Sequence, residues 1–142
     1  MNAIETVQQI YAAFSRGDVP AIHERLADDM EWEYATGPNP IPWLQPLKGG
    51  VEVPTFFEAL FSNVEITCFE VGKIFGHTSK VVDLVNLEYT ARATGCKVVD
   101  VDAVHVWHFN DAGQVQRFRH CADTWLQAWL IDEAGAAAAE DR

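Results

Sequence analysis

Apolar positions in the first part of the chain recur with the period of an α-helix. Residues 2–15 place an apolar side chain every three or four positions, and Asn2 with Glu5 matches the capping-box pair that begins helices. Asp18 is suited to cap a second, short helix that ends near residue 27, and a third helix is expected over 51–62. This part of the chain is therefore predicted to be mainly helical.

The period changes from 3.6 to two residues after residue 65. A shorter alternating stretch ends near Tyr34, before the breaker cluster at 37–40 and a loop of roughly a dozen residues, a length typical of a lid or binding segment. Four long strands separated by short turns are predicted at 65–76, 80–93, 96–109 and 114–126. Helices followed by strands predict an α+β domain in which one strongly curved, mostly antiparallel sheet wraps around three N-terminal helices.

Composition narrows the classes of partner. The chain has 142 residues with 10 Lys+Arg and 21 Asp+Glu, so its net charge is −11. Such a charge repels phosphates and anionic headgroups, which argues against nucleic-acid and membrane partners. The opening residues lack the pattern of a signal peptide, and no apolar run reaches the ~18–20 residues that span a bilayer. We expect a cytoplasmic protein with one domain over 1–133 and a flexible tail over 134–142.

The turns predict which residues share a face of the sheet. A two-residue turn at 94–95 pairs Leu84 with His105, and the following turn pairs His105 with Arg119. The inward face in this register carries Asn86, Glu88, Arg92, Val99, Val101, Ala103, His105, Trp107, Arg119, Cys121 and Asp123. A β-bulge would reverse these assignments beyond it.

Four ionisable residues, Glu88, His105, Arg119 and Asp123, share this face with Val, Ala and Trp. A carboxyl group in apolar surroundings is suited to take up and release a proton in catalysis. The same four residues could instead form a structural network of ion pairs that holds the sheet together. The pattern alone leaves both interpretations open.

Several segments together resemble a known family. They are Tyr11–Asp18, Leu26–Trp32, the helix with Phe56 and Phe57, Ala93–Gly95, His105–Phe109, Gly113 and Phe118–Asp123. In this order they are similar to the SnoaL-like polyketide cyclases of the nuclear-transport-factor-2-like, or ketosteroid-isomerase-like, superfamily, over about residues 4–126. The resemblance implies a cone-shaped α+β barrel around an apolar pocket, usually in a homodimer. It implies no single activity, because the superfamily contains cyclases, isomerases, epoxide hydrolases and non-catalytic binding domains.

The resemblance also assigns roles to individual positions. In the ketosteroid isomerase pattern, Ile10 stands at the tyrosine position, Tyr34 at the position of the base and His105 at that of the acidic oxyanion donor. In the epoxide hydrolase pattern, Asp123 matches the last aspartate, but the segment 86–88 lacks the required arginine. In the cyclases, an aspartate at the end of the last strand is the acid/base residue, and Asp123 matches it.

These observations predict an enzyme that transfers a proton on a small apolar carbonyl or polyketide-like substrate, of the cyclase or isomerase type. Asp123 would move the proton, and His105 or Arg119 would stabilise the enolate oxygen. Contacts with the substrate are expected from Tyr34, Trp43, Glu88, Val101, Trp107 and Cys121. The alternative is a non-catalytic ligand-binding or accessory domain of the same fold.

No metal or cofactor is expected. The three cysteines follow neither a zinc-ligand nor a disulfide spacing. His105 and His108 would lie on opposite faces of a strand, and His120 is interpreted as an ordinary outer-face residue. A homodimer is expected through the outer sheet face, where an apolar patch would otherwise be exposed. That patch is predicted to contain Val85, Leu87, Tyr89, Val104 and Val106.

Overall fold

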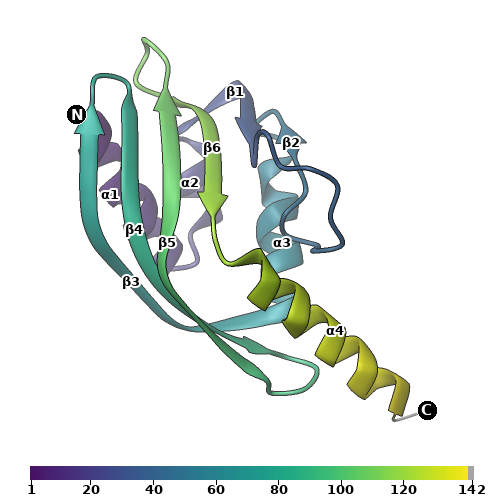
Figure 1. The fold of residues 1–142 in the computed structure, drawn as a ribbon. Helices are drawn as coiled ribbons and strands as arrows, with labels where there is room; N and C mark the ends of the chain where they lie inside the picture. Colours follow the sequence, from purple (N-terminus) through teal and green to yellow (C-terminus); the bar gives the residue numbers. More distant parts are fainter. Residues whose placement is uncertain (141–142) are drawn as a thin grey trace.

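The computed structural model describes residues 1–140 and packs three helices behind one face of a six-stranded sheet (Figure 1). The helices are α1 (Ala3–Ser15), α2 (Val19–His23), α3 (Val53–Asn63) and α4 (Thr124–Glu140). The strands are β1 (Leu26–Trp32), β2 (Leu47–Lys48), β3 (Val64–His77), β4 (Lys80–Ala91), β5 (Lys97–Phe109) and β6 (Val115–Cys121). The strand order is β2-β1-β6-β5-β4-β3, and every pair is antiparallel except β1 with β6.

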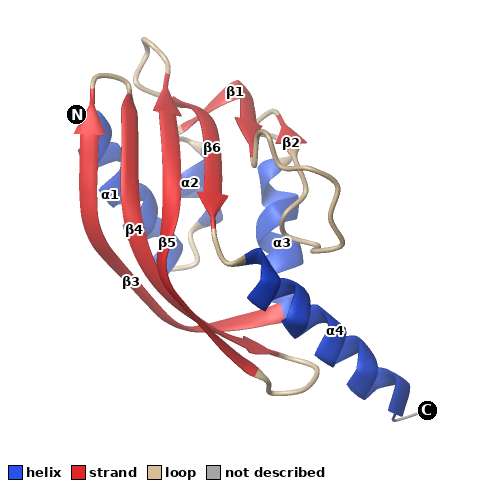
Figure 2. Cartoon of the chain, viewed as in Figure 1, coloured by secondary structure: helices blue, strands red, loops and turns tan. Residues whose placement is uncertain are grey.

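Curvature of the sheet creates the interior of the domain. Strands β3, β4 and β5 are long and bend strongly toward one end, while α1, α2 and α3 lie against the concave face (Figure 2). The sheet remains open, because its edge strands β2 and β3 do not pair with each other. The predicted α+β class, with a curved and mostly antiparallel sheet around N-terminal helices, is confirmed.

Helix α1 begins where the sequence predicts. The Glu5 backbone N–H donates to Asn2 Oδ1 at 2.8 Å, and the Asn2 backbone N–H donates to Glu5 Oε2 at 3.3 Å, which completes the capping box. The helix then buries Val7, Ile10 and Tyr11 against the sheet. Tyr11 thereby brings a hydroxyl group into the apolar interior.

Two irregularities in the strands change the predicted faces. Asp83, not Leu84, lies opposite His105, and the pairing of β4 with β5 shifts by one residue between Val85 and Leu87. On β5 this shift coincides with Asp102, whose φ of 56° is in the left-handed region expected at a bulge. The prediction that Glu88, Val99 and Val101 face inward is therefore wrong, and the outer side chain of Val101 is 66% exposed.

The second shift lies between β5 and β6. Phe109 faces Val115 as predicted, but the register moves by one residue directly before this pair, so His105 lies opposite His120. Phe118 is consequently buried, whereas Arg119 is half-buried and Cys121 exposed on the outer face. The expected inward positions of Arg119 and Cys121 are wrong for this reason.

Strand β6 ends earlier than predicted and continues into α4. The backbone N–H of Leu126 donates to Asp123 Oδ1 at 3.2 Å, so Asp123 caps this helix instead of extending the strand. Gln127 and Leu130, three residues apart, are buried against the domain. The helix runs through most of the segment predicted as a tail, to Glu140, and the last two residues of that prediction lie outside the described part of the chain.

The outer face of the sheet is partly apolar. Val82, Leu84, Val104 and Val106 are half-buried there, and of the predicted outer patch only Val104 and Val106 lie on this face. Val85, Leu87 and Tyr89 are instead buried inside, because the shift in register turns the apolar side of β4 inward. Within residues 1–140, no helix combines the length and the hydropathy that a membrane crossing requires.

Substitution of Asp123 by Ala removes the capping oxygen of α4 and is expected to lower the free energy of unfolding by about 1 kcal/mol. Urea unfolding measures this difference. Asp111→Ala, at an exposed position in the turn before β6, is the control and is expected to change stability by less than about 0.5 kcal/mol. Equal stability of the Asp123 variant and the native protein would contradict the capping role.

Candidate active site

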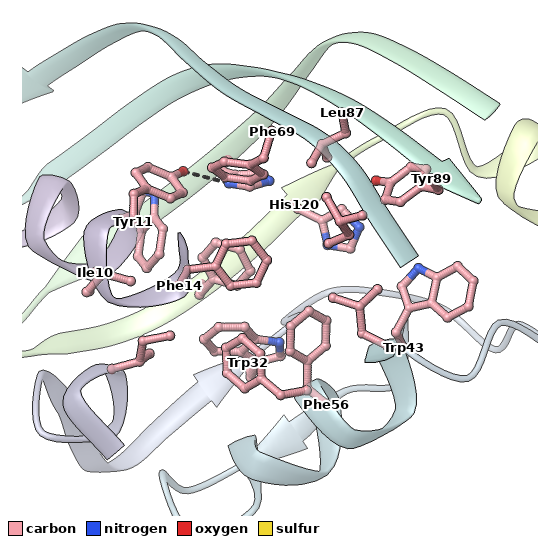
Figure 3. Close-up of a pocket in the computed structure, with 17 residues that line it drawn as sticks. Ile10, Tyr11, Phe14, Trp32, Trp43, Phe56, Phe69, Leu87, Tyr89 and His120 are labelled. Atoms are coloured by element: carbon pink, nitrogen blue, oxygen red, sulfur yellow. Dashed lines mark hydrogen bonds between the residues drawn. The ribbon is translucent and has the colours of Figure 1, made fainter. Parts of the chain in front are cut away.

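An apolar cavity lies between the concave face of the sheet and helices α1 and α3 (Figure 3). Its volume is about 80 Å³, counted over the positions that the centre of a water molecule can occupy. One bound water needs roughly 10–15 Å³ on this measure, so the cavity can hold several ligand atoms. The aromatic wall residues are Tyr11, Phe14, Trp32, Trp43, Phe56, Phe57, Phe69, Tyr89, Trp107 and Phe118. Walls of this kind favour a flat, apolar ligand.

A buried carboxyl group, Asp83 on β4, lies behind the cavity wall. Its side chain has no exposed surface; Oδ1 accepts a hydrogen bond from the Tyr11 hydroxyl at 2.5 Å, and Oδ2 accepts one from Trp107 Nε1–H at 2.8 Å. Burial raises the pKa of Asp83 to about 6, although both hydrogen bonds favour the charged form and limit the rise. Asp83 therefore exchanges its proton close to neutral pH.

Tyr11 connects Asp83 to His105. The Tyr11 hydroxyl lies 2.6 Å from His105 Nδ1, whereas His105 Nδ1 and Asp83 Oδ1 are 3.8 Å apart, too far for a direct hydrogen bond. Burial, together with the neighbouring His120, lowers the pKa of His105 to about 3, so its imidazole is neutral at physiological pH. Burial and the charge of Asp83 raise the pKa of Tyr11 far above its ordinary value, so the phenol keeps its proton.

The hydrogen bonds fix the tautomer of His105 when Asp83 is ionised. Tyr11 then donates its only proton to the Asp83 carboxylate, and the Tyr11 oxygen must accept the hydrogen bond from His105 Nδ1–H. The remaining ring nitrogen, Nε2, carries a lone pair. Because the His105 ring lines the cavity, this lone pair is the basic group of the site.

A second imidazole, His120 on β6, is paired with Glu33. His120 Nδ1 hydrogen-bonds to Glu33 Oε1, and the Glu33 side chain has no exposed surface. Glu33 follows β1 with a φ of 55°, a left-handed conformation that is uncommon for residues other than glycine. This conformation sends the carboxyl inward directly after Trp32, whose side chain is also buried.

Burial favours the state in which the Glu33–His120 pair carries no net charge. In that state Nε2 of His120 bears a hydrogen, whether the shared proton lies nearer to Nδ1 or to Oε1. The rings of His105 and His120 lie 5.9 Å apart, at 81° to each other, and both line the cavity. One apolar cavity thus contains a lone-pair nitrogen and an N–H donor, which suits proton transfer between two atoms of one ligand.

Three of the residues predicted for the site line this cavity: His105, Trp43 and Trp107. Trp43 comes from the loop that the sequence singled out, and its Nε1–H donates to Gln127 Oε1 on α4 at 3.1 Å. Asp123 is exposed at the start of α4, so the prediction that it faces the cavity is wrong.

The other predicted contacts lie on the outer face. The Tyr34 hydroxyl is 2.7 Å from His108 Nε2, and the guanidinium of Arg117 lies 4.3 Å from the Tyr34 ring centroid. The left-handed backbone at Glu33 interrupts the alternation and turns Tyr34 outward. Glu88 accepts a hydrogen bond from Thr67 at 2.7 Å, away from the cavity. Val101, Arg119 and Cys121 lie on that side too, for the register reasons given above.

Sequence reasoning missed Tyr11, Glu33, Asp83 and His120 as site residues. Tyr11 fits the apolar stripe of the first helix, and that pattern does not indicate a role for its hydroxyl group. For Asp83 a signal existed, because it alternates with Val81, Val85 and Leu87 and therefore shares the most apolar face of its strand. Glu33 and His120 come together only because β1 pairs in parallel with β6, and no local sequence pattern predicts that pairing.

Within the described part of the chain, no three His, Cys, Asp or Glu residues are grouped as a metal site.

Comparison with known proteins adds a family and a fold. The model of the SnoaL-like domain family matches residues 7–118 of the chain. Among curated proteins, none matches it significantly. An NTF2-like protein of unknown function from Burkholderia pseudomallei K96243 has 27% sequence identity and a TM-score of 0.80, with 92% of this chain and 98% of that chain covered.

Two further solved structures contain ligands. TerC, co-crystallized with polyporic acid, has 21% identity and a TM-score of 0.74 over 92% of this chain and 98% of its own. Rv0760c from Mycobacterium tuberculosis, in complex with estradiol-17β-hemisuccinate, has 19% identity and a TM-score of 0.72, with 87% of this chain and 95% of that chain covered. At these identities the likeness is one of fold.

Substitution of Asp83 by Asn is expected to change how stability depends on pH. The raised pKa of Asp83 means that its stabilising contribution is full below about pH 4 and is lost as the pH rises through about 6. Between pH 4 and pH 7 the native protein should therefore lose about 2 kcal/mol relative to the Asn variant. Urea unfolding of both proteins at the two pH values measures this, and because both contain His105, its titration largely cancels. A stability difference that is independent of pH would refute the assignment.

Proposed function

We propose that this chain, which belongs to the SnoaL-like domain family, is an enzyme that moves a proton within a small, flat carbonyl compound. The observation that carries the proposal is the pair of buried imidazoles, His105 and His120, which face one aromatic cavity and are each connected to a carboxyl group of their own. Acid/base catalysis requires one group that accepts a proton and another that donates one in the same apolar site, and His105 and His120 meet this requirement.

His105 is the base of the proposed reaction. Its Nε2 lone pair removes a proton from the carbon next to the substrate carbonyl, and the electron pair of that C–H bond forms the enolate. Above about pH 6 Asp83 is ionised, and through Tyr11 it keeps the His105 proton on Nδ1, away from the cavity. The basic nitrogen is thus preorganised before the substrate arrives.

His120 is the acid of the proposed reaction. Its Nε2–H donates to the carbonyl oxygen, where negative charge develops as the enolate forms. The low polarity of the aromatic walls strengthens this interaction relative to water. The enolate then either takes the proton back at another carbon, which is an isomerisation, or attacks a second carbonyl carbon of the same molecule, which closes a ring.

The comparisons support the class of ligand. Rv0760c was crystallised with a steroid derivative and TerC with polyporic acid, and both have the fold of this chain. The aromatic walls described above suit ring systems of this kind. The alternative that the chain only binds such a ligand, as an accessory domain, predicts binding without turnover.

Deuterium exchange tests the activity. A panel of steroid-like and polyketide-like ketones in heavy water is expected to gain deuterium next to the carbonyl in the presence of the protein. His105→Asn and His120→Asn each keep an N–H at the Nδ1 position but lack Nε2, and each should lower the exchange rate by roughly 10²–10⁴-fold. His77→Asn, at the exposed last residue of β3, is the matched control and should keep the native rate. Ketones that bind to the native protein without exchanging would support the accessory-domain alternative.

We also propose that two copies pair through the outer sheet face. The half-buried Val82, Leu84, Val104 and Val106 form an apolar patch there, which a second copy would cover. Sedimentation equilibrium at micromolar concentration is expected to give a dimer, and Val104→Lys should shift it toward monomer, since a charge would be buried in the contact. A native protein that sediments as a monomer would contradict the proposal.

A further inference from the structure

The carboxyl group of Asp83 orients His105 through Tyr11, but orientation alone does not require a carboxyl group that is buried and ionisable. It has no exposed surface and does not line the cavity, so a ligand there does not reach it. A buried carboxylate is costly, and two hydrogen bonds from Tyr11 and Trp107 compensate it only in part, as its raised pKa shows. A role that acts through Tyr11 and His105 would explain why the chain keeps it.

We propose that, as His105 takes a proton from the substrate, it passes its Nδ1 proton to Tyr11 and Tyr11 passes its own hydroxyl proton to Asp83, which holds that proton until the transfers reverse. This inference rests on the proposed function of the same site. As Nε2 of His105 forms its new N–H bond, the Nδ1–H bond breaks and that proton bonds to the Tyr11 oxygen. The original Tyr11 O–H bond breaks, and its proton bonds to Asp83 Oδ1. The negative charge of Asp83 thus reappears on the substrate, while His105 and Tyr11 are neutral before and after the step.

The distances allow transfer through Tyr11 and no shorter route. Both links are hydrogen bonds, of 2.5 Å from Tyr11 to Asp83 and 2.6 Å from Tyr11 to His105, whereas the direct separation of His105 Nδ1 and Asp83 Oδ1 is 3.8 Å. Tyr11 comes from α1, so this helix completes a connection between two neighbouring strands.

Electrostatics places the proton on Asp83. Burial disfavours an imidazolium at His105, whose pKa falls to about 3, and disfavours a carboxylate at Asp83, whose pKa rises to about 6. Transfer of a proton to Asp83 therefore avoids a positively charged His105 ring beside His120. The ionisable groups facing this network from the packed elements are Tyr11, His105, His120 with its partner Glu33, and Tyr89 farther along β4. Strand β3 contributes only Ile66 and Phe69 to the cavity.

In the proposed relay, the charge of Asp83 decides which nitrogen of His105 bears the ring hydrogen. When Asp83 is protonated, it donates to the Tyr11 oxygen, Tyr11 donates to His105 Nδ1, and the ring hydrogen lies on Nε2. Nitrogen-15 NMR of the His105 ring in the full chain distinguishes the two tautomers without any substrate. The Nδ1–H form should dominate about tenfold at pH 7, and the Nε2–H form about tenfold at pH 5.

Variants separate the relay from a structural role. Asp83→Asn should hold the Nε2–H form at both pH values, because its carbonyl accepts from Trp107 while its amide donates to Tyr11. Tyr11→Phe should abolish the pH dependence of the tautomer and lower the exchange rate roughly 10²-fold. Tyr89→Phe removes a cavity phenol outside the relay and should leave the pH dependence of the tautomer unchanged.

A second variant covers the case in which Tyr11→Phe does not fold. Trp107→Phe removes one hydrogen bond to the charged form of Asp83 and should move the tautomer midpoint to higher pH. A native His105 tautomer that is constant from pH 5 to pH 8, or one that still changes in Tyr11→Phe, would overturn the relay. Deuterium exchange with a constant tautomer would leave the proposed function standing without the relay. A tautomer change without exchange of any ketone would show that Tyr11 couples Asp83 to His105, but it would contradict the proposed function and with it the transfer that accompanies removal of a substrate proton.

Discussion

Asp83 gives up its hydration on folding and receives two hydrogen bonds in exchange, one from Tyr11 and one from Trp107. The partners come from α1 and β5, while the carboxyl itself belongs to β4. The contact therefore forms only when the helix lies on the concave face and the two strands pair in the observed register. The packing of these elements and the chemistry of the site therefore both depend on Asp83, Tyr11 and Trp107. If the helix or one of the strands were misplaced, Asp83 would be a buried charge without hydrogen-bond partners.

The two carboxyl–imidazole units differ in total charge, and this difference separates their roles. Glu33 contacts His120 directly, so one proton can be shared and the pair can be neutral. Asp83 and His105 are separated by a phenol, so an ionised Asp83 leaves a net negative unit with a lone pair toward the cavity. Two units that each consist of a carboxyl group and an imidazole thus give a base and an acid, because one unit has an additional hydroxyl between its ends.

Much of the fold followed from hydrophobic periodicity, because the capping box, the apolar stripe of α1 and the alternating strands are local signals. Side-chain facing was predicted less well, since it depends on register across strands. The turn that pairs Phe109 with Val115 was predicted correctly, yet a shift of one residue directly beside it exchanged Arg119 for His120 at the site. His105, Trp43 and Trp107 were predicted because their positions do not depend on that shift. Glu33 required a left-handed backbone at a residue that gives no sign of it.

The bulge at Asp102 also bears on how such a chain can diverge in evolution. It adds one residue to β5, so that Val98 and Asp100 point inward on one side of it and Ala103, His105 and Trp107 do so on the other. Loss of one residue from the bulge would restore regular alternation and leave Val98 and Asp100 facing inward, whereas loss of Val104 from the regular strand would put the two inward residues Ala103 and His105 next to each other, where they must face opposite sides. Descendants of this chain can therefore shorten β5 by one residue at the bulge and keep the same side chains on the concave face, whereas a deletion in the regular strand beside His105 would exchange them.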